Sequence, residues 1–199
     1  MVALGDPGGK IMRINSVVFA MAFLAVSNAH AGFVADKGAE AEKLVENGDP
    51  LAAVDALNAA VEAVWRDMPL TVRNLRHVKS AMGYGVYAER ADNVYKSNET
   101  VLLYAELLGQ MLGESDLGDK EVGIDIDLVL TNGSGKRVFS GKGIVKLRQP
   151  VRYLNKEFML KIDLTFNGAP ADKYVAALTA RDVHSDKTTS FDVAFEIVE

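Results

Sequence analysis

The sequence predicts an α+β protein in which an N-terminal helical hairpin precedes an antiparallel β-sandwich of about seven strands. Apolar residues recur every three or four positions between residues 36 and 82, whereas after residue 100 they alternate with polar residues. Hydrophobic residues make up 49% of the 199 residues and charged residues 25%, as in globular proteins with a buried core. We therefore expect a signal peptide over residues 1–31, a helical segment over 32–83 and a β domain over 84–199.

The first 31 residues have the pattern of a secretory signal peptide. Lys10 and Arg13 precede an apolar run over residues 17–26, and Ala-His-Ala at the end of the segment predicts cleavage after Ala31. The run is too short to span a bilayer, which takes about 20 apolar residues. A buried N-terminal helix or a membrane anchor is the alternative, and Met12 is an alternative start. We expect export to the periplasm or the extracellular space, with no membrane span in the mature chain.

Composition excludes several classes of function. The chain contains no cysteine, which rules out disulfides, thiolate catalysis and a lipidated N-terminal cysteine. Its net charge is −5, whereas nucleic-acid-binding proteins are strongly basic on at least one face. We therefore expect no nucleic-acid partner.

Two helices are predicted before residue 69. The first runs over residues 36–46 and ends at Asn47-Gly48, after which Asp49 and Pro50 supply an N-cap and a first helical residue. The second carries an apolar stripe at steps of three and four, formed by Leu51, Val54, Leu57, Val61, Val64, Trp65 and Met68. A third short helix over residues 71–82 fits the same spacing. We expect the stripe to dock on the β domain.

The stretch Val101–Leu108 is apolar at nearly every position and predicts a strand that is buried on both faces. We expect one face to meet the sandwich core and the other to meet the helical stripe, with Leu103 and Tyr104 pointing to opposite layers. The other expected strands lie near residues 86–89, 122–131, 138–147, 158–166, 174–180 and 191–197. Asn132-Gly133 predicts the hairpin turn between two of them.

The segment Ala169-Pro170-Ala171-Asp172-Lys173-Tyr174 opens the penultimate expected strand. It resembles the tyrosine corner of immunoglobulin-like domains, and the resemblance extends over residues 86–199. It implies an immunoglobulin-like sandwich in which the Tyr174 ring packs inward and its hydroxyl bonds to nearby backbone. The chain departs from antibody-type domains because it lacks the cysteine pair and a core tryptophan in the β domain. The resemblance implies a fold and no particular function.

The search for chemistry yields no catalytic residue, no cofactor site and no metal site that we would assign. Asp125 and Asp127 share one face of a strand, where a carboxylate pair can serve acid–base chemistry or bind a cation. Asp182 and His184 lie in a predicted loop and add oxygen and nitrogen ligands. The competing interpretations, a solvated outer face for the first pair and an ordinary turn for the second, are favoured.

Basic residues gather on the strand that follows the Asn132-Gly133 turn. Lys142, Lys146 and Arg148 have one strand parity and apolar residues the other, and Arg152 follows shortly after. This predicted basic face has three interpretations: it binds an acidic protein or an anionic envelope component, it docks the chain's own acidic helices, or it is a solvated edge.

The leading functional hypothesis is an exported, non-catalytic binding protein of the cell envelope. The first alternative is an enzyme or a small-ligand or metal carrier that uses dispersed polar residues, of which Asp125, Asp127, Asp182 and His184 are the candidates. The second alternative is a structural or assembly module that acts by adding a strand at an open sheet edge.

Overall fold

The computed structural model describes residues 27–153 and 155–199 and divides the chain into two compact units, 1–60 and 61–199. The predicted signal peptide lies outside the described residues except for its last five positions, which belong to helix α1 (Ser27–Glu46). Helix α2 (Pro50–Asp67) begins in the first unit and ends in the second. Within the described ranges no helix is long and apolar enough to cross a membrane.

The predicted helical hairpin is confirmed, but its packed face differs from the expected one. Asp49 caps α2 as predicted, because its Oδ1 accepts a hydrogen bond from the Ala52 amide at 3.1 Å. The buried residues of the first unit are small: Ala41 of α1 packs against Ala53 and Ala56 of α2.

The large aliphatic residues of the predicted stripe lie outside the contact between α1 and α2 and are exposed. The exposed fractions are 73% for Leu51, 52% for Val54 and 48% for Leu57, and Val61 and Val64 are similarly exposed. Alanines allow two helix backbones to approach closely, so the alanine face packs in place of the bulky one. None of these five aliphatic residues is buried, whereas Trp65 of the same stripe is 6% exposed.

The third helix predicted over residues 71–82 is a strand, β1 (Thr71–Gly83). Its register against β4 (Val101–Leu108) shifts between Arg73 and Arg76, and Asn74 there has a φ of 52°. Such a bulge inserts an extra residue, so Val72 and Leu75 both pack toward the core although they are three positions apart. The bulge therefore gave a strand the apolar spacing of a helix.

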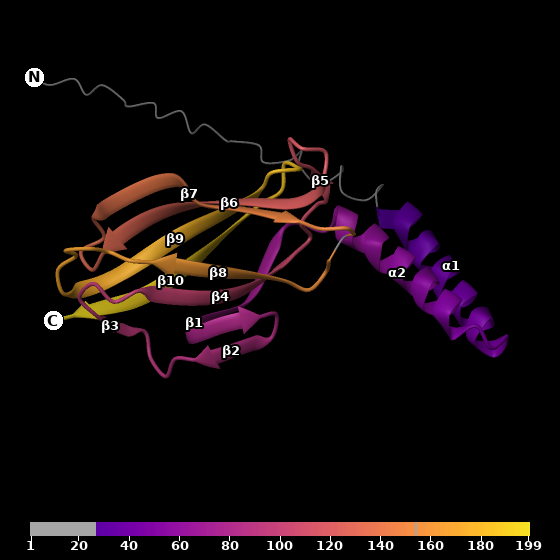
Figure 1. Ribbon diagram of the computed structural model, residues 1–199, viewed down its shortest axis with the longest axis horizontal. Coiled ribbons are helices and arrows are strands. Elements are labelled where there is room, and N and C mark those ends of the chain that lie inside the picture. Colours follow the sequence, from indigo (N-terminus) through magenta and orange to yellow (C-terminus); the bar gives the residue numbers. More distant parts are fainter. Residues whose placement is uncertain (1–26, 154) are drawn as a thin grey trace, which may run out of the picture. The chain divides into compact units, whose positions relative to one another are not determined.

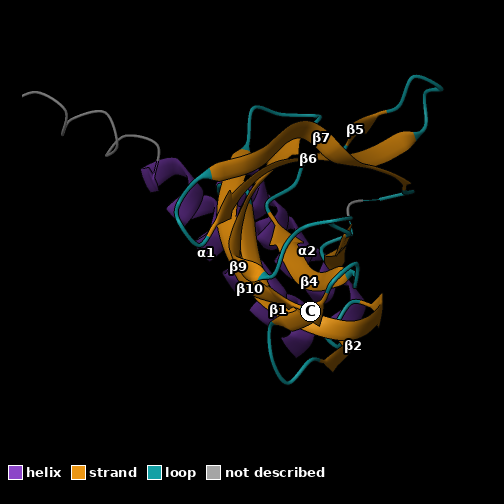
Figure 2. Cartoon of the chain, turned by 90° about the vertical axis from the view of Figure 1, so that its left-hand side faces the viewer, coloured by secondary structure: helices purple, strands orange, loops and turns teal. Residues whose placement is uncertain are grey.

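The described residues of the β unit form ten strands in two sheets instead of about seven, and Figure 1 labels these strands. The four-stranded sheet has the order β2 (Val86–Glu89), β1, β4, β8 (Phe158–Leu164). The second sheet has the order β3 (Val94–Lys96), β10 (Thr188–Val198), β9 (Asp172–Asp182), β6 (Lys120–Asn132), β5 (Gly113–Glu114), and β7 (Arg137–Pro150) pairs with β6. All pairings are antiparallel except that of β10 with β3. The sheets curl into a half-barrel rather than a clear immunoglobulin-like sandwich (Figure 2).

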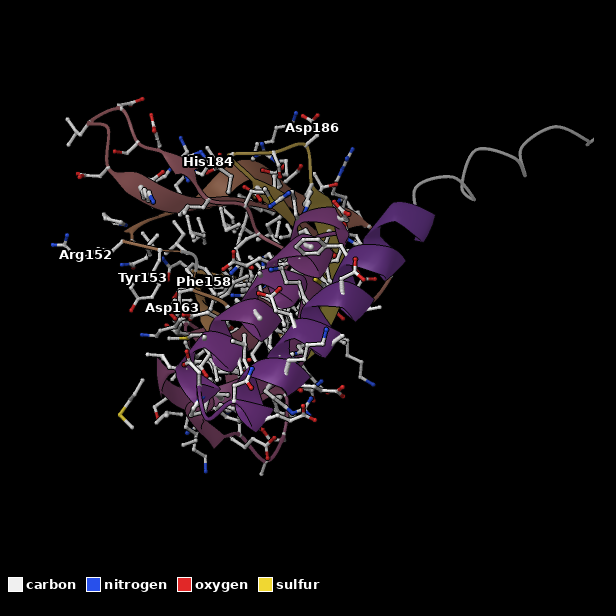
Figure 3. All side chains as sticks on the ribbon, turned by 90° about the vertical axis from the view of Figure 1, so that its right-hand side faces the viewer. Arg152, Tyr153, Phe158, Asp163, His184 and Asp186 are labelled. Atoms are coloured by element: carbon white, nitrogen blue, oxygen red, sulfur yellow. The ribbon has the colours of Figure 1, made fainter. Side chains whose placement is uncertain are left out.

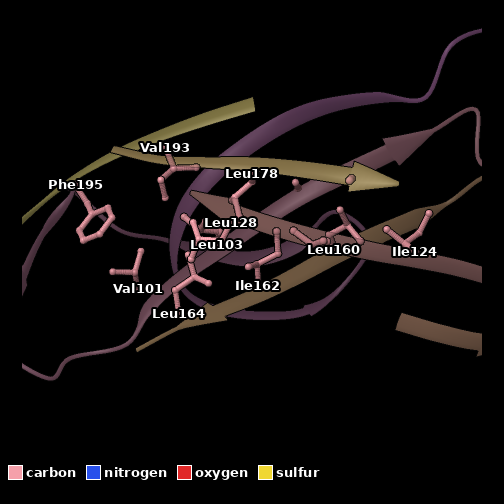
Figure 4. Packing of buried hydrophobic residues seen from close by; sticks show 14 of the residues in the cluster. Val101, Leu103, Ile124, Leu128, Leu160, Ile162, Leu164, Leu178, Val193 and Phe195 are labelled. Carbon is pink, nitrogen blue, oxygen red and sulfur yellow. The ribbon is translucent and has the colours of Figure 1, made fainter. Parts of the chain in front are cut away.

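The core lies between the two sheets and confirms the predicted alternation. β6 buries every second residue from Val122 to Leu130, and β8 buries Phe158, Leu160, Ile162 and Leu164. Figure 4 shows Leu103, Ile162 and Leu178 meeting in this layer, and each has an exposed fraction of 0%. The apolar surface that these strands remove from water is the main stabilising contribution to the β unit.

Leu103 and Tyr104 point to opposite faces of β4, as predicted, and both are fully buried. The Tyr104 face is covered by the β1–β2 hairpin. The Tyr87 ring lies 4.3 Å from the Tyr104 ring, and the Gly85 amide donates a hydrogen bond of 2.8 Å to the Tyr104 hydroxyl. The β1–β2 hairpin therefore forms the layer on the Tyr104 side of β4.

The geometry expected of a tyrosine corner is present. The Tyr174 ring is buried and stacks on Phe195 at a centroid distance of 5.5 Å. Its hydroxyl donates a hydrogen bond of 2.8 Å to the carbonyl oxygen of Pro170, four residues upstream. This contact fixes the loop between β8 and β9, although the fold around it is broader than a seven-stranded sandwich.

Candidate functional site

β7 and β8 border an opening in the half-barrel. β7 is hydrogen-bonded to β6, and β8 is the terminal strand of its sheet, where it pairs with β4. The two strands are consecutive in sequence and are joined by residues 151–157, but their partners lie in different sheets (Figure 1). Each strand therefore turns an edge of its backbone toward the opening.

Two adjoining hollows run along this opening and share Val145. The first, of about 530 Å³, lies between residues 138–145 of β7 and the C-terminal end of β8 with its following loop. The second, of about 360 Å³, lies between residues 145–151 and the N-terminal half of β8. From the first hollow to the second, residue numbers rise along β7 and fall along β8. The two strands therefore run antiparallel to each other across the opening. We call the two hollows together the β7–β8 groove.

The groove is apolar and reaches the core. Its floor includes the buried residues Leu128 and Leu164, which also belong to the core cluster. Its rim on β7 carries Val138 and Phe139, with exposed fractions of 48% and 47%. Exposed apolar side chains beside an opening into the core are typical of binding surfaces.

The end wall of the first hollow is held by a set of fixed contacts. The Phe166 ring stacks on Phe195 at a centroid distance of 5.3 Å and an interplanar angle of 10°. The Gly168 amide donates a hydrogen bond of 3.1 Å to the Asn98 side chain, and the Tyr174 hydroxyl holds Pro170. This wall is therefore formed before any ligand arrives, which lowers the entropic cost of binding.

The predicted basic face lies on the outer side of β7, beside the groove. Arg148 pairs with Asp125 at 2.8 Å, so part of this charge is compensated within the molecule. Lys142 and Lys146 are exposed, and Lys146 lies opposite Asp125 in the β6–β7 ladder. Arg152 is exposed in the loop after β7 (Figure 3).

Asp125 and Asp127 share the outer face of β6, as predicted, but each carboxylate has its own arginine. Arg181 forms two hydrogen bonds to Asp127, at 2.8 and 3.1 Å, and the Gly143 amide donates a third at 2.7 Å. The Arg181 guanidinium, aided by the Gly143 amide, holds the pKa of Asp127 below its usual value. The two aspartates are thus separate ion-pair partners and do not form a joint acid–base or cation site.

Asp182 is the last residue of β9 and belongs to a structural cluster with His184, which Figure 3 labels. The buried Asp182 carboxylate accepts hydrogen bonds from the Met111 amide at 2.6 Å and the His184 amide at 2.9 Å. The His184 Nε2 lies 3.3 Å from Glu121 Oε1, a partner that the sequence did not indicate. Over residues 27–153 and 155–199, no group of three or more histidine and carboxylate side chains is placed to hold a metal ion.

The groove itself was not found from the sequence. Its signal is the adjacent apolar pair Val138-Phe139, both of which line the first hollow, because the β6–β7 register shifts here and Val138 is the extra residue. A strand with one solvated face carries polar residues at alternate positions, so such a pair indicates a second covered or binding surface.

No family model matches the sequence, and no curated protein matches it. Several solved structures are partly similar, among them two enzymes. One is a family 123 glycoside hydrolase from Clostridium perfringens (TM-score 0.37, 8% identity, 65% of this chain and 27% of that chain). The other is the Pseudomonas fluorescens alkylpurine DNA glycosylase AlkC bound to DNA containing an abasic site analog (TM-score 0.35, 7% identity, 78% and 40%). The chain therefore spans less than half of either structure, and similarities this low carry no argument about its function.

Proposed function

We propose that this protein is a non-catalytic binding module that accepts an extended polypeptide segment as an added strand between β7 and β8. One observation carries the proposal: β7 and β8 are edge strands of different sheets, and an apolar groove lies between them. The proposal joins two hypotheses drawn from the sequence, a binding protein and a module that acts by strand addition.

The physical basis is the unmet hydrogen-bonding capacity of the strand edges. A chain that lies between β7 and β8 pairs its amide and carbonyl groups with both strands, which provides affinity that depends little on sequence. Its alternate side chains point into the groove and cover Val145, Leu128 and Leu164. The added strand connects the two sheets at their open side and closes the half-barrel.

The β7 edge also has features that oppose uncontrolled pairing with other chains. The β6–β7 register shifts between Ile126 and Leu128. These two residues of β6 are two positions apart, but their partners on β7, Val145 and Gly141, are four positions apart. Gly143, with a φ of 56°, lies within this bulge. Bulges and exposed lysines hinder edge-to-edge aggregation, so the groove favours a partner that fits it over a chance β-strand.

The test is hydrogen–deuterium exchange with a neutral probe peptide, acetyl-Thr-Val-Thr-Val-Thr-Val-Thr-amide, which matches the seven residues of β8 in length. We expect the peptide to slow exchange in both β7 and β8, because both edges acquire hydrogen-bond partners. Amides of β9, an interior strand, are the internal reference and should not change.

The matched control is the same peptide N-methylated at every residue, which keeps its side chains but removes the hydrogen-bond donors from both of its strand edges. Loss of protection with this control supports strand addition. Equal binding of both peptides would mean that the groove holds apolar side chains without strand pairing, and the proposal would be wrong. The same exchange experiment is repeated with the peptides that carry Glu and Phe. If no peptide slows exchange in β7 or β8 at saturation, the proposal of strand addition is wrong.

We further propose that the chain is exported and that residues 1–31 are removed. The support is the signal-peptide pattern, together with the observation that cleavage after Ala31 keeps Ala41 and most of α1. Expression of the full chain in a bacterial host, followed by N-terminal sequencing, is expected to give an extracytoplasmic product beginning at Gly32. A product that keeps Met1 or Met12 and stays in the cytoplasm would contradict export.

A further inference from the structure

We infer that the segment bound in the β7–β8 groove is an amphipathic strand with acidic residues facing outward and one aromatic residue facing inward at the first hollow. The inference rests on the proposed function and specifies the partner's chemistry. Two features of the groove point to it: the charges on its borders and the shape of its first hollow.

Positive charge borders the second hollow from both sides. On β7, Lys146 lies between Val145 and Leu147, which face the groove, so the lysine side chain faces outward. On β8, Lys161 lies between the buried residues Leu160 and Ile162 and is likewise exposed. A strand between them places its outward side chains next to both lysines.

The chain's own carboxylates leave part of this charge available, and Glu157, which also lines the second hollow, adds one negative charge just before β8. Asp125, which lies opposite Lys146 in the ladder, is paired with Arg148 at 2.8 Å. The Lys161 ammonium is 3.6 Å from Asp163, but both side chains are about half exposed, and such pairs are weak. Acidic side chains on the inserted strand therefore complement the border, because opposite charges on adjacent strands attract across the sheet.

The first hollow suits an aromatic side chain. Phe139 on its rim and Phe166 in its end wall offer ring faces and edges, and Tyr174 closes its inner end. Because Phe166 and Tyr174 each stack on Phe195, their positions are fixed in advance. An added ring can make offset or edge-to-face contacts with such groups without ordering them.

The spacing of the two features agrees with a single strand. Inward side chains of a strand recur every second residue, about 7 Å apart. An aromatic residue at the first hollow is then followed by smaller aliphatic residues at the second hollow, which adjoins the first at Val145. Acidic residues occupy the intervening outward positions beside Lys146 and Lys161.

The experiment measures the affinity of fluorescently labelled peptides for the purified protein. The probe is acetyl-Thr-Phe-Glu-Val-Glu-Val-Thr-amide, compared with versions that carry Lys in place of both Glu residues or Ala in place of Phe. We expect either change to weaken binding on the order of tenfold, because it reverses the cross-strand charges or leaves the hollow unfilled. The penalty of the Lys version should shrink at high salt.

The matching protein variants remove the two lysines, as Lys146→Gln with Lys161→Gln. The control is Lys79→Gln with Lys96→Gln, two exposed lysines on β1 and β3 that give the same change in net charge. We expect the first pair to abolish the preference for Glu over Lys peptides. The control pair should preserve it, and Phe139→Ser should reduce the preference for Phe over Ala.

The outcomes separate the inference from the function on which it rests. If the neutral probe protects β7 and β8 but binds as well as the Glu and Phe versions, the proposed function stands and the inferred partner is wrong. If the preferences persist in Lys146→Gln with Lys161→Gln, the charge argument is refuted. A scrambled peptide of the same composition tests the alternation. If it binds as tightly as the alternating probe, the inference is also wrong.

Discussion

Leu103→Asp is expected to leave the β unit unfolded under conditions in which the wild-type chain is folded. Leu103 is fully buried in the core layer, and its neighbour across the β4–β8 ladder is the equally buried Ile162. A carboxylate at this position has no partner and must either remain charged in an apolar environment or take up a proton. This cost is comparable with the whole stability of a typical domain, about 5–15 kcal/mol.

Tyr104→Asp is expected to have the same outcome on the opposite face of β4. The substitution removes the ring that packs on Tyr87 and places a second carboxylate on the strand face that carries Glu106. Circular dichroism during urea titration measures both variants. The control is Val86→Asp, because Val86 is 51% exposed and should tolerate the charge. A cooperative transition near the wild-type midpoint in either β4 variant would contradict the burial that we describe.

Glu106→Ala is expected to lower the free energy of unfolding by about 2 kcal/mol, the cost of leaving buried polar groups without partners. The Glu106 side chain is 7% exposed and its Oε2 lies 2.7 Å from the Arg73 guanidinium. The Tyr104 hydroxyl donates to Oε1 at 3.1 Å and the Tyr84 hydroxyl to Oε2 at 3.2 Å. Removal of this one carboxylate therefore leaves these three donors, and the Asn74 side chain, without their acceptor.

The same sheet provides a control for Glu106. Glu89 of β2 pairs with Arg76 of β1 at 3.2 Å, but these side chains are 61% and 48% exposed. Glu89→Ala is therefore expected to cost less than about 1 kcal/mol, as for other exposed pairs. Equal losses in the two variants, measured by chemical denaturation, would show that burial does not strengthen the Glu106 interactions.

The Glu106 network also predicts a dependence of stability on pH. Burial by itself raises the pKa of Glu106, but hydrogen bonds from Asn74, Arg73, Tyr104 and Tyr84 outweigh it and hold the pKa below the ordinary value of 4.5. Because the folded-state pKa is the lower one, the stabilisation is complete above the unfolded pKa and is lost as pH falls through the folded pKa. The stability difference between wild type and Glu106→Ala should therefore shrink in acid.

Local patterns in the sequence determined several parts of the protein. The Asp49-Pro50 start of α2 depends on groups within one turn, and the alternation in β6 and β8 reflects the two faces of a single strand. The Tyr174 hydrogen bond also spans four residues. These features are readable because both the residues and their partners lie close together in the sequence.

Other features depend on residues that are far apart in the sequence, so they are visible only in the tertiary structure. A bulge at Asn74 gave β1 a helical spacing, and this strand becomes recognisable only where it pairs with β4. Within the predicted basic face Lys146 is exposed, whereas Arg148 is compensated by Asp125 of the neighbouring strand.

The β7–β8 groove is the clearest case of this division. Alternation is a property of each strand alone, so the sequence is enough to predict that β7 and β8 are strands with apolar inner faces. Whether two consecutive strands pair with each other or with strands of different sheets depends on contacts between residues far apart in the chain. In the fold, β7 pairs with β6 of one sheet and β8 pairs with β4 of the other. This arrangement separates the two strands and leaves the groove between them.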